Sequence, residues 1–197
     1  MDDTYKTINN TSKAIITEQK SKFISYAIPV SSVDYIKNEL EKYKKEYYDA
    51  RHICWAYMLG SDRKEFRAND DGEPSGTAGK PILGQINSNE LTNILVLVVR
   101  YFGGIKLGTS GLIGAYRMAA SEAIQNAEII EKTVDMQLTF SFEYPFMNDV
   151  MKVVKDMDAT IVAQLYNMDC EMTLEIRKAL FDTMKNRLLK VETLNLK

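Results

Sequence analysis

The sequence predicts an α+β protein with two successive domains. A mixed α and β domain is expected over residues 1–133, and a ferredoxin-like βαββαβ domain over residues 134–197. Two observations carry this prediction. Residues 93–99 are apolar without alternation, which is typical of a central strand buried on both faces. From residue 136 to residue 143, apolar and polar side chains alternate, as in a strand with one face in solvent.

The first domain combines strand-like runs, bounded by turn residues, with stripes of apolar residues spaced three or four apart. Ser31 or Ser32 is expected to cap the first helix, because a serine oxygen accepts hydrogen bonds from the free N–H groups of a helix start. In order, the predicted elements are a strand over residues 22–30, a helix to about Tyr47, strands over residues 52–59 and 93–99, and an alanine-rich helix from Thr109 or Ser110 to about Glu128.

The pattern changes near Thr133, and no long linker separates the two domains. Beyond this point, strand and helix signals follow one another in the order βαββαβ, which is the ferredoxin-like arrangement. The predicted elements are a strand over residues 136–143, a helix that opens at Pro145, strands over residues 159–166 and 170–176, a helix over residues 178–190 and a short terminal strand.

Composition narrows the class of protein. Hydrophobic residues make up 45% and charged residues 26% of the chain, which are ordinary values for a globular protein with a core. The net charge of −2 argues against a dedicated binder of duplex DNA, which needs a strongly basic surface. The sequence shows neither a transmembrane run nor a signal peptide, so no membrane partner is expected. Cys54 and Cys170 are isolated, which favours reduced thiols and a cytoplasmic location.

Glycine is concentrated between residues 70 and 116, where all but one of the ten glycines lie. A glycine-rich turn between a buried strand and a helix start predicts an anion site, because backbone N–H groups and the helix dipole favour negative charge there. The turn matches neither the Walker nor the dinucleotide-binding pattern, and the alternative is that its glycines only shape a tight turn. The predicted anion-binding residues are Lys80, Arg100, Gly103, Gly104, Lys106, Gly108, Ser110 and Gly111.

Acidic residues precede this turn in the chain. Asp70, Asp71 and Glu73 carry oxygens that suit a hard cation such as Mg²⁺. The same residues could instead pair with Arg67 and Arg100, or cap turns. We therefore expect no obligatory cofactor, with Mg²⁺ or a bound phosphate as the alternatives. We also expect Asp71 and Glu73 to converge on one surface with the cations of the glycine-rich segment.

His52 is the only histidine of the chain and a weak candidate for a catalytic base. Alternation along a strand would place it on the same face as Cys54. A catalytic Cys–His pair is one interpretation of this spacing, but a buried structural cysteine is favoured. No catalytic residue is therefore predicted, and the balance is against an enzyme.

Several motifs occur together in this chain. His52 and Cys54 are followed by Asp71-Gly72-Glu73-Pro74 and then by Arg100-Tyr101-Phe102-Gly103-Gly104. Gly76-Thr77-Ala78-Gly79 and Lys106-Leu107-Gly108 extend the combination. In these motifs the chain resembles the IMPACT/YigZ family of small cytoplasmic proteins, in the bacterial form that has a second domain.

The resemblance implies a fold for each domain and a function in the regulation of translation. It implies a first domain similar to the second domain of ribosomal protein S5, an α/β sandwich, and a second domain similar to domain V of elongation factor G. The eukaryotic relative is a regulator of translation initiation. The family pattern would place a glycine at Ser110 and an arginine at Gly114, so this chain has one cation fewer near the predicted anion site.

Two functions compete. The resemblance favours a non-catalytic, nucleic-acid- or ribosome-associated binding protein linked to regulation of translation, with RNA, the ribosome or a translation factor as partner. The alternative is an enzyme that acts on a phosphorylated small molecule or a nucleic-acid end through the glycine-rich residues 70–111. RNA contact would need a local patch of cations beside aromatic rings that stack on bases. The candidate cations are Arg67, Lys80, Arg100, Lys106 and Arg117, and the candidate stacking residues are Tyr101, Phe102 and Tyr116.

Overall fold

The computed structural model describes residues 3–166 and 169–197, and its chain divides into two compact units. The first unit is Tyr5–Lys132. The second combines Thr133–Lys197 with Asp3 and Thr4, which the sequence analysis placed in the first domain. Both units contain helices and strands, so the predicted mixture of α and β structure is confirmed. Among the described residues, no helix has the length and apolarity needed to cross a membrane.

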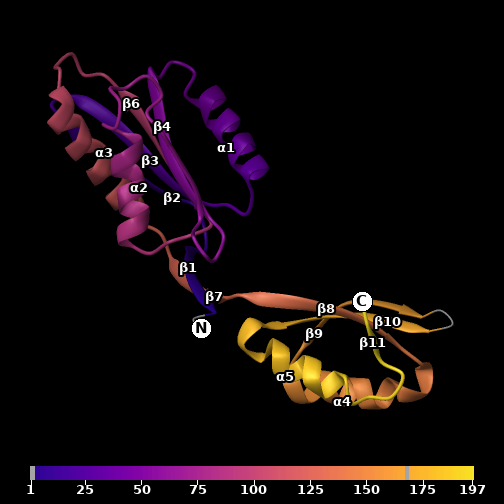
Figure 1. Ribbon diagram of the computed structural model, residues 1–197. Coiled ribbons are helices and arrows are strands. Elements are labelled where there is room, and N and C mark those ends of the chain that lie inside the picture. The colour runs from indigo at the N-terminus through magenta and orange to yellow at the C-terminus, as the bar shows by residue number, and fades with distance from the viewer. Residues whose placement is uncertain (1–2, 167–168) are drawn as a thin grey trace. The chain divides into compact units, whose positions relative to one another are not determined.

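The first unit is built on a five-stranded antiparallel sheet that carries helices on both faces (Figure 1). One helix covers one face, and two helices cover the other. In sheet order the strands are β2 (Ser12–Glu18), β3 (Ser21–Pro29), β6 (Ile94–Tyr101), β4 (His52–Leu59) and β5 (Glu65–Asn69); α1 (Val33–Glu46) covers one face, and α2 (Gly79–Ser88) and α3 (Gly108–Gln125) cover the other.

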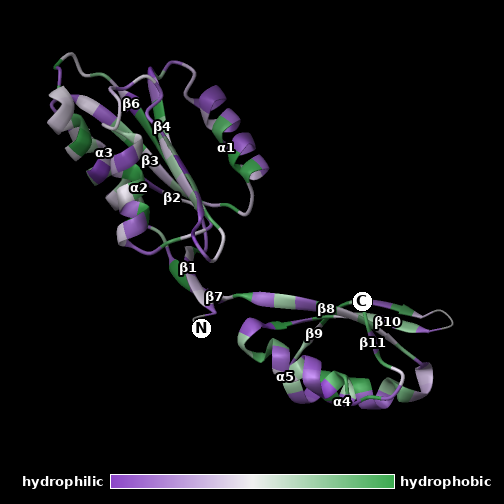
Figure 2. Cartoon of the chain, in the orientation of Figure 1, coloured by the Kyte–Doolittle hydropathy of each residue, from purple (hydrophilic) through white to green (hydrophobic). Residues whose placement is uncertain are grey.

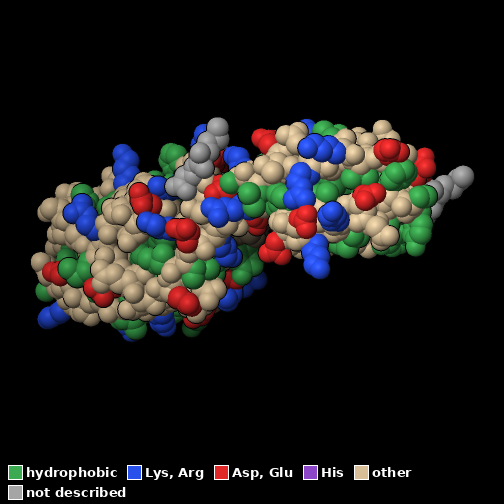
Figure 3. Space-filling model, turned by 90° about the horizontal axis from the view of Figure 1, so that it is seen from below, with side chains coloured by type: hydrophobic (Ala, Val, Ile, Leu, Met, Phe, Trp, Pro, Cys, Tyr) green, Lys and Arg blue, Asp and Glu red, His purple; other side chains and the backbone are tan. Residues whose placement is uncertain are grey.

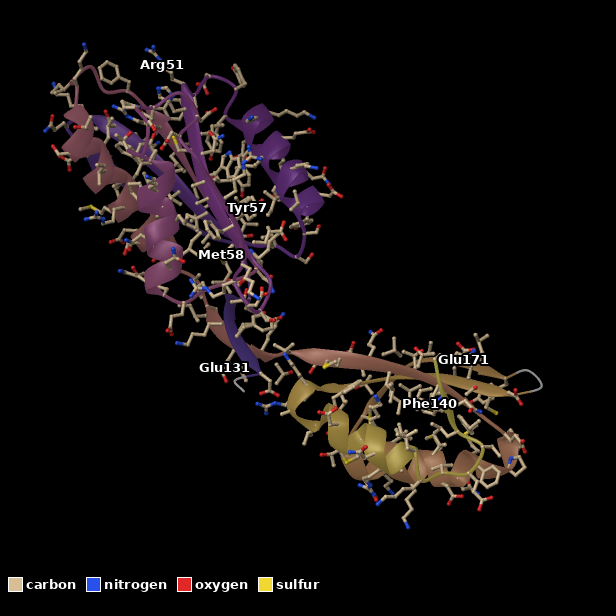
Figure 4. The ribbon with its side chains drawn as sticks, viewed as in Figure 1. Arg51, Tyr57, Met58, Glu131, Phe140 and Glu171 are labelled. Atoms are coloured by element: carbon tan, nitrogen blue, oxygen red, sulfur yellow. The ribbon has the colours of Figure 1, made fainter. Side chains whose placement is uncertain are left out.

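The middle strand, β6, is buried on both faces, as its uninterrupted apolar run predicts. Because side chains alternate along a strand, each strand of this sheet feeds two separate cores. Tyr57 and Met58, neighbours in β4, point to opposite sides of the sheet (Figure 4). Tyr57 belongs to the core under α1, and Met58 to the core under α2 and α3. The hydropathy colouring in Figure 2 shows the same apolar sheet between more polar outer helix faces.

The two predicted helices of this unit form for the expected reasons. The N–H of Tyr35 donates to Ser32 Oγ at 3.2 Å, so Ser32 is the cap of α1. α3 buries alanines, whose small side chains let the helix pack closely against the sheet. Its buried alanines are Ala115, Ala119, Ala120 and Ala123.

The predictions for the first unit did not include α2, the edge strands β2 and β5 of the sheet, or two short strands outside it. α2 begins at Gly79 within a segment rich in glycine and proline, and its apolar stripe is short. The sheet covers that stripe, and tertiary packing therefore stabilises a helix that local preference does not favour. Two further strands, β1 (Thr4–Ile8) and β7 (Ile129–Thr133), pair with each other in a separate two-stranded sheet.

The second unit has the predicted order βαββαβ, with its strands in the antiparallel order β11-β8-β10-β9. This is the split βαβ arrangement. In β8 the even-numbered residues Leu138, Phe140 and Phe142 are buried against two helices, which confirms the predicted alternation. The elements are β8 (Asp135–Phe142), the 3₁₀ turn η1 (Tyr144–Phe146), α4 (Met147–Met157), β9 (Thr160–Tyr166), β10 (Cys170–Arg177), α5 (Lys178–Leu188) and β11 (Asn195–Leu196).

Asp3 supplies the cap that α5 does not obtain from its own residues. Its carboxylate accepts hydrogen bonds from Arg177 Nε at 2.7 Å, from a terminal Arg177 nitrogen at 2.6 Å and from the N–H of Ala179 at 3.0 Å. The hydrogen bond from Arg177 is the main reason why the pKa of Asp3 falls from 3.8 to about 2. The start of the chain is thereby fixed to the second unit.

We expect this group to make stability depend on pH in the acid range. Because its pKa is lowered on folding, Asp3 stabilises the native state above pH 3.8, and this stabilisation is lost as the pH falls towards about 2. Asp3→Asn should lower the urea midpoint at neutral pH and flatten its dependence on pH below 4. The matched control is Asp182→Asn on the exposed surface of α5, which should leave both unchanged. A pH dependence that persists in Asp3→Asn would contradict this assignment.

Candidate anion-binding site

A pocket of about 370 Å³ lies at the end of the first unit's sheet where β4 begins and β6 ends. Figure 4 shows Arg51 at this end of the unit. Four segments build the pocket: the start of β4, the loop before α2, the loop after β6 and the first turn of α3. The lining residues are Arg51, His52, Glu73, Pro74, Arg100, Phe102, Lys106, Leu107, Gly108, Thr109 and Leu112.

A buried polar network forms the inner wall. A terminal nitrogen of Arg100 donates to Glu73 Oε1 at 2.6 Å, and the hydroxyl of Tyr116 donates to the same oxygen at 2.8 Å. The Cys54 sulfur lies 3.3 Å from the Tyr116 hydroxyl oxygen. Glu73 is 8% exposed and Arg100 is 7% exposed, so the pair is shielded from water. A buried pair of this kind is costly to break from one side.

The Arg100 guanidinium is held in place by its neighbours, but they do not use all of its hydrogen-bond donors. It lies over the ring of Phe23 at 5.6 Å and over the ring of Phe102 at 5.8 Å. Both contacts are within the range of cation–π attraction. Its Nε is buried and has no hydrogen-bond partner among the described residues. A buried donor without a partner is energetically costly, so the Arg100 side chain keeps one unused hydrogen-bond donor next to the pocket.

The two aspartates before α2 shape the loop that carries Glu73. Asp70 accepts hydrogen bonds from the N–H groups of Gly76, Ala78 and Gly79 at 2.8, 3.0 and 2.8 Å. Burial alone would raise the pKa of Asp70, but these three N–H groups outweigh burial and lower it. Asp71 Oδ2 accepts the N–H of Ile53 at 2.6 Å. Both carboxylates thus cap backbone rather than point into the pocket.

The predicted convergence is therefore partial. Glu73, Arg100 and Lys106 meet at the pocket, but the carboxylate of Asp71 turns away to β4. Within residues 3–166 and 169–197, no group of three or more His, Cys, Asp or Glu side chains is placed so that it could hold a metal ion.

His52 and Cys54 form hydrogen bonds with different backbone carbonyls, those of Asp71 and Asp70. His52 Nδ1 lies 2.7 Å from the carbonyl oxygen of Asp71 and must donate, because a carbonyl only accepts. The Cys54 thiol donates to the carbonyl of Asp70 at 2.9 Å, and burial strongly raises its pKa. A thiolate nucleophile is therefore disfavoured at neutral pH. This arrangement matches the structural cysteine that the sequence favours over a catalytic pair.

The glycines of the β6–α3 loop have different structural roles. A Cβ on Gly103 would lie 2.0 Å from the backbone of Lys20, so the loop can follow this path only with glycine. Gly104 and Gly108 have positive φ, whereas Gly111 packs on Leu107. Gly108 opens α3, and the side chain of the N-cap residue, Leu107, makes no capping hydrogen bond among the described residues. Gly103, Gly104 and Gly111 fit the tight-turn alternative, and Gly108 together with the exposed Ser110 fits an anion site.

The predicted cations do not form one patch. Arg100 is buried in its ion pair and contributes no free charge. Lys80 and Arg117 line a different groove, of about 470 Å³, between α2 and α3. Arg67 lies over the ring of Trp55 at 6.0 Å. Of the five predicted cations, only Lys106 lies at the pocket with its charge exposed.

The stacking residues also separate. Phe102 lines the pocket and is 52% exposed, so its ring is open to a ligand. Tyr116 is completely buried beneath Glu73, which corrects the prediction that it stacks on bases. Tyr101 donates to Asp49 at 2.7 Å and packs against the core under α1, on the other side of the sheet. A single exposed ring therefore remains at the site.

Two polar residues of the pocket, Arg51 and Thr109, were not among the predicted site residues. Arg51 precedes β4, and its exposed side chain makes no ion pair in the part of the chain that the structure describes. Thr109 is exposed in the first turn of α3. The signal for Arg51 was its place next to His52, because antiparallel pairing sets His52 opposite Arg100. Gly114, where the family pattern expects arginine, is exposed, and a Cβ there meets nothing within 4 Å.

The lining of the pocket carries more basic than acidic side chains. Three lining cations, Arg51, Arg100 and Lys106, face one lining carboxylate, Glu73. Elsewhere, on the face that Figure 3 shows, basic and acidic side chains are interspersed over each unit. A ligand attracted to this chain by charge would therefore find its best match at a confined site.

Comparisons with known proteins extend these observations. Residues 19–124 match the family of the Impact N-terminal domain. The IMPACT family member YvyE of Bacillus subtilis is 35% identical over 152 residues, which cover 77% of this chain and 70% of that protein. The IMPACT family member YigZ of Escherichia coli is 35% identical over 164 residues, with coverages of 82% and 78%. A crystal structure described as a hypothetical protein is similar over 100% of this chain and 97% of its own, with a TM-score of 0.78 and 28% identity.

Proposed function

The chain belongs to the IMPACT family, and on this premise we propose that it is a cytoplasmic, non-catalytic binding protein that contacts single-stranded RNA in the regulation of translation. The link to translation is supported by the resemblance of its motifs to those of a translation regulator. The pocket of the first unit is the proposed contact site. RNA carried by the ribosome or by a translation factor is the corresponding partner.

One observation carries the proposal: an exposed aromatic ring stands beside cations that have no carboxylate partner. Phe102 is half exposed at the pocket mouth, and Arg51 and Lys106 line the same pocket with no ion pair among the described residues. Stacking of bases on aromatic rings, combined with a few cations along the backbone, is the usual way to bind single strands. A binding role suits this pocket better than catalysis, because burial raises the pKa of the neighbouring Cys54 thiol and His52 is engaged by a backbone carbonyl.

We expect binding to be weak and sensitive to salt. Two or three phosphate contacts place affinity near that of non-specific complexes, with a Kd of about 10⁻⁴–10⁻⁶ M at physiological salt. Each contact contributes about −0.7 to the slope of log affinity against log salt for a single strand. Arg51→Ala with Lys106→Ala should therefore flatten the slope by about 1.4. Phe102→Ala should weaken binding by about 1–3 kcal/mol through lost stacking.

The measurement is fluorescence anisotropy of a labelled single-stranded RNA over a salt series. Lys64→Ala is the control, because Lys64 is exposed and lies beyond the opposite end of β4. It should leave the slope unchanged. Binding that is undetectable at low salt, or that is the same in the double variant, would exclude RNA at this pocket and favour a protein partner.

A further inference from the structure

The first turn of α3 forms one wall of the pocket and is open to a ligand. The helix is 18 residues long, has no acidic residue in its first turn, and its N-cap residue, Leu107, makes no side-chain hydrogen bond to the described helix start. The first N–H groups of a helix have no partner within the helix, and the helix dipole adds partial positive charge there. Gly108 and Thr109 of this turn both line the pocket.

A second, independent observation points to the same ligand chemistry. Arg100 lines the pocket, is more than nine-tenths buried and has a buried Nε that finds no hydrogen-bond partner in the described part of the chain. Its pair with Glu73 fixes the guanidinium in position, and the contacts with Phe23 and Phe102 hold its plane. A donor already held in place loses little entropy when an anion binds.

The net charge of the pocket lining indicates which kind of phosphate fits the pocket. Glu73 neutralises Arg100, so Arg51 and Lys106 leave the lining with two uncompensated positive charges. An internal phosphate of RNA carries one negative charge, whereas a terminal phosphate monoester carries about 1.5–2 at neutral pH. The second kind matches the pocket more closely. Phe102, Leu107 and Leu112 supply an apolar side against which the attached nucleoside can lie.

We infer that the pocket binds the phosphate monoester of a phosphorylated nucleoside, with the phosphate at the start of α3 between Arg51 and Lys106 and the base beside Phe102. This inference rests on the proposed function, since it specifies which part of a single strand enters the pocket. The 5′-phosphorylated end of an RNA and a free nucleoside 5′-monophosphate present the same chemistry. The experiment separates the two sources.

The test compares one short RNA with a 5′-phosphate and with a 5′-hydroxyl, labelled at the 3′ end, with AMP as competitor. We expect the phosphorylated RNA to bind about tenfold tighter, as hydrogen bonds to a charged group permit. Thr109→Glu places a negative charge at the helix start and should remove the preference. Thr109→Gln has the same size without the charge and should retain it, which separates electrostatics from loss of fold.

The outcomes distinguish this inference from the proposed function. Equal binding of the two RNAs would overturn the phosphate inference and leave RNA binding standing. A preference that survives Thr109→Glu would also overturn it, because the phosphate would then lie elsewhere. Binding of AMP without binding of either RNA would support the phosphate site, assign it to a free nucleotide and overturn the RNA function. Absence of binding by all three probes would overturn both.

Discussion

Replacing Glu73 by glutamine should destabilise the first unit by about 3 kcal/mol, in the lower part of the range for breaking a buried ion pair from one side. The Arg100 guanidinium would remain buried at 7% exposure without a counter-charge, although the amide oxygen of glutamine can still accept its hydrogen bond. The measurement is urea unfolding of the full chain, followed by the fluorescence of Trp55, which is the only tryptophan and lies in the first unit.

Tyr116→Phe is the matched control for this network. It removes the hydroxyl that donates to Glu73 Oε1 at 2.8 Å but leaves the ion pair intact, so it should cost about 1 kcal/mol. Replacing Glu73 and Arg100 together by methionine should lower the free energy of unfolding by less than the sum of the single changes. The reason is that the double variant has no buried charge without a counter-charge. If Glu73→Gln were no more harmful than Tyr116→Phe, the ion pair would not be the stabilising element.

Gly103→Ala should cost about 3 kcal/mol of stability, at the upper end of the usual range for overpacking. The new Cβ would lie 2.0 Å from the carbonyl carbon and oxygen of Lys20 and 2.4 Å from the nitrogen of Ser21. These are backbone atoms of the β2–β3 connection, so no side chain can rotate to make room. The loop must shift, and Phe102 and Lys106 shift with it. We therefore expect anion and RNA binding to weaken together with stability.

Gly104→Ala tests whether the effect is one of space. Gly104 has φ of +90°, but a Cβ there meets nothing within 4 Å. Only the left-handed backbone conformation is penalised, at about 1–2 kcal/mol. Thermal unfolding of both variants beside the parent measures the difference. Equal losses at the two positions would show that backbone strain, and not close approach of the two loops, explains the requirement for glycine.

Local patterns predicted the elements that bury a continuous apolar surface. β6 and α1 were predicted from the unbroken run at residues 93–99 and from the stripe behind Ser32. α2 was not, because its start is rich in glycine and its cap is Asp70, which lies nine positions before Gly79. A cap at that distance leaves no signal in a helical window.

The site was predicted in outline, but the roles of its residues were not. Most of the motif segments meet at one pocket, which Lys106, Phe102 and Gly108 line, whereas Gly76 lines the groove between α2 and α3. Pairing of the acidic residues with Arg100 was one of the alternatives, but the sequence could not select Glu73, 27 positions away, or place Tyr116 beneath the pair. Burial and pairing across such distances depend on strand register and helix placement, which composition does not encode. Arg51 was overlooked for the same reason, since only the pairing of β4 with β6 brings it to the pocket.

The contact of Asp3 with Arg177 has a consequence for the order of folding. The chain starts in the second unit, leaves it at Tyr5 and returns at Thr133, so the first unit is inserted into the second. Asp3 is synthesised 174 positions before its partner Arg177. The entropy lost in closing a loop grows with its length, and a folded insertion shortens the effective loop. Because β1 pairs with β7, folding of the first unit brings its own two ends together. Variants that delay the first unit should therefore also delay completion of the second, even though their cores share no residue.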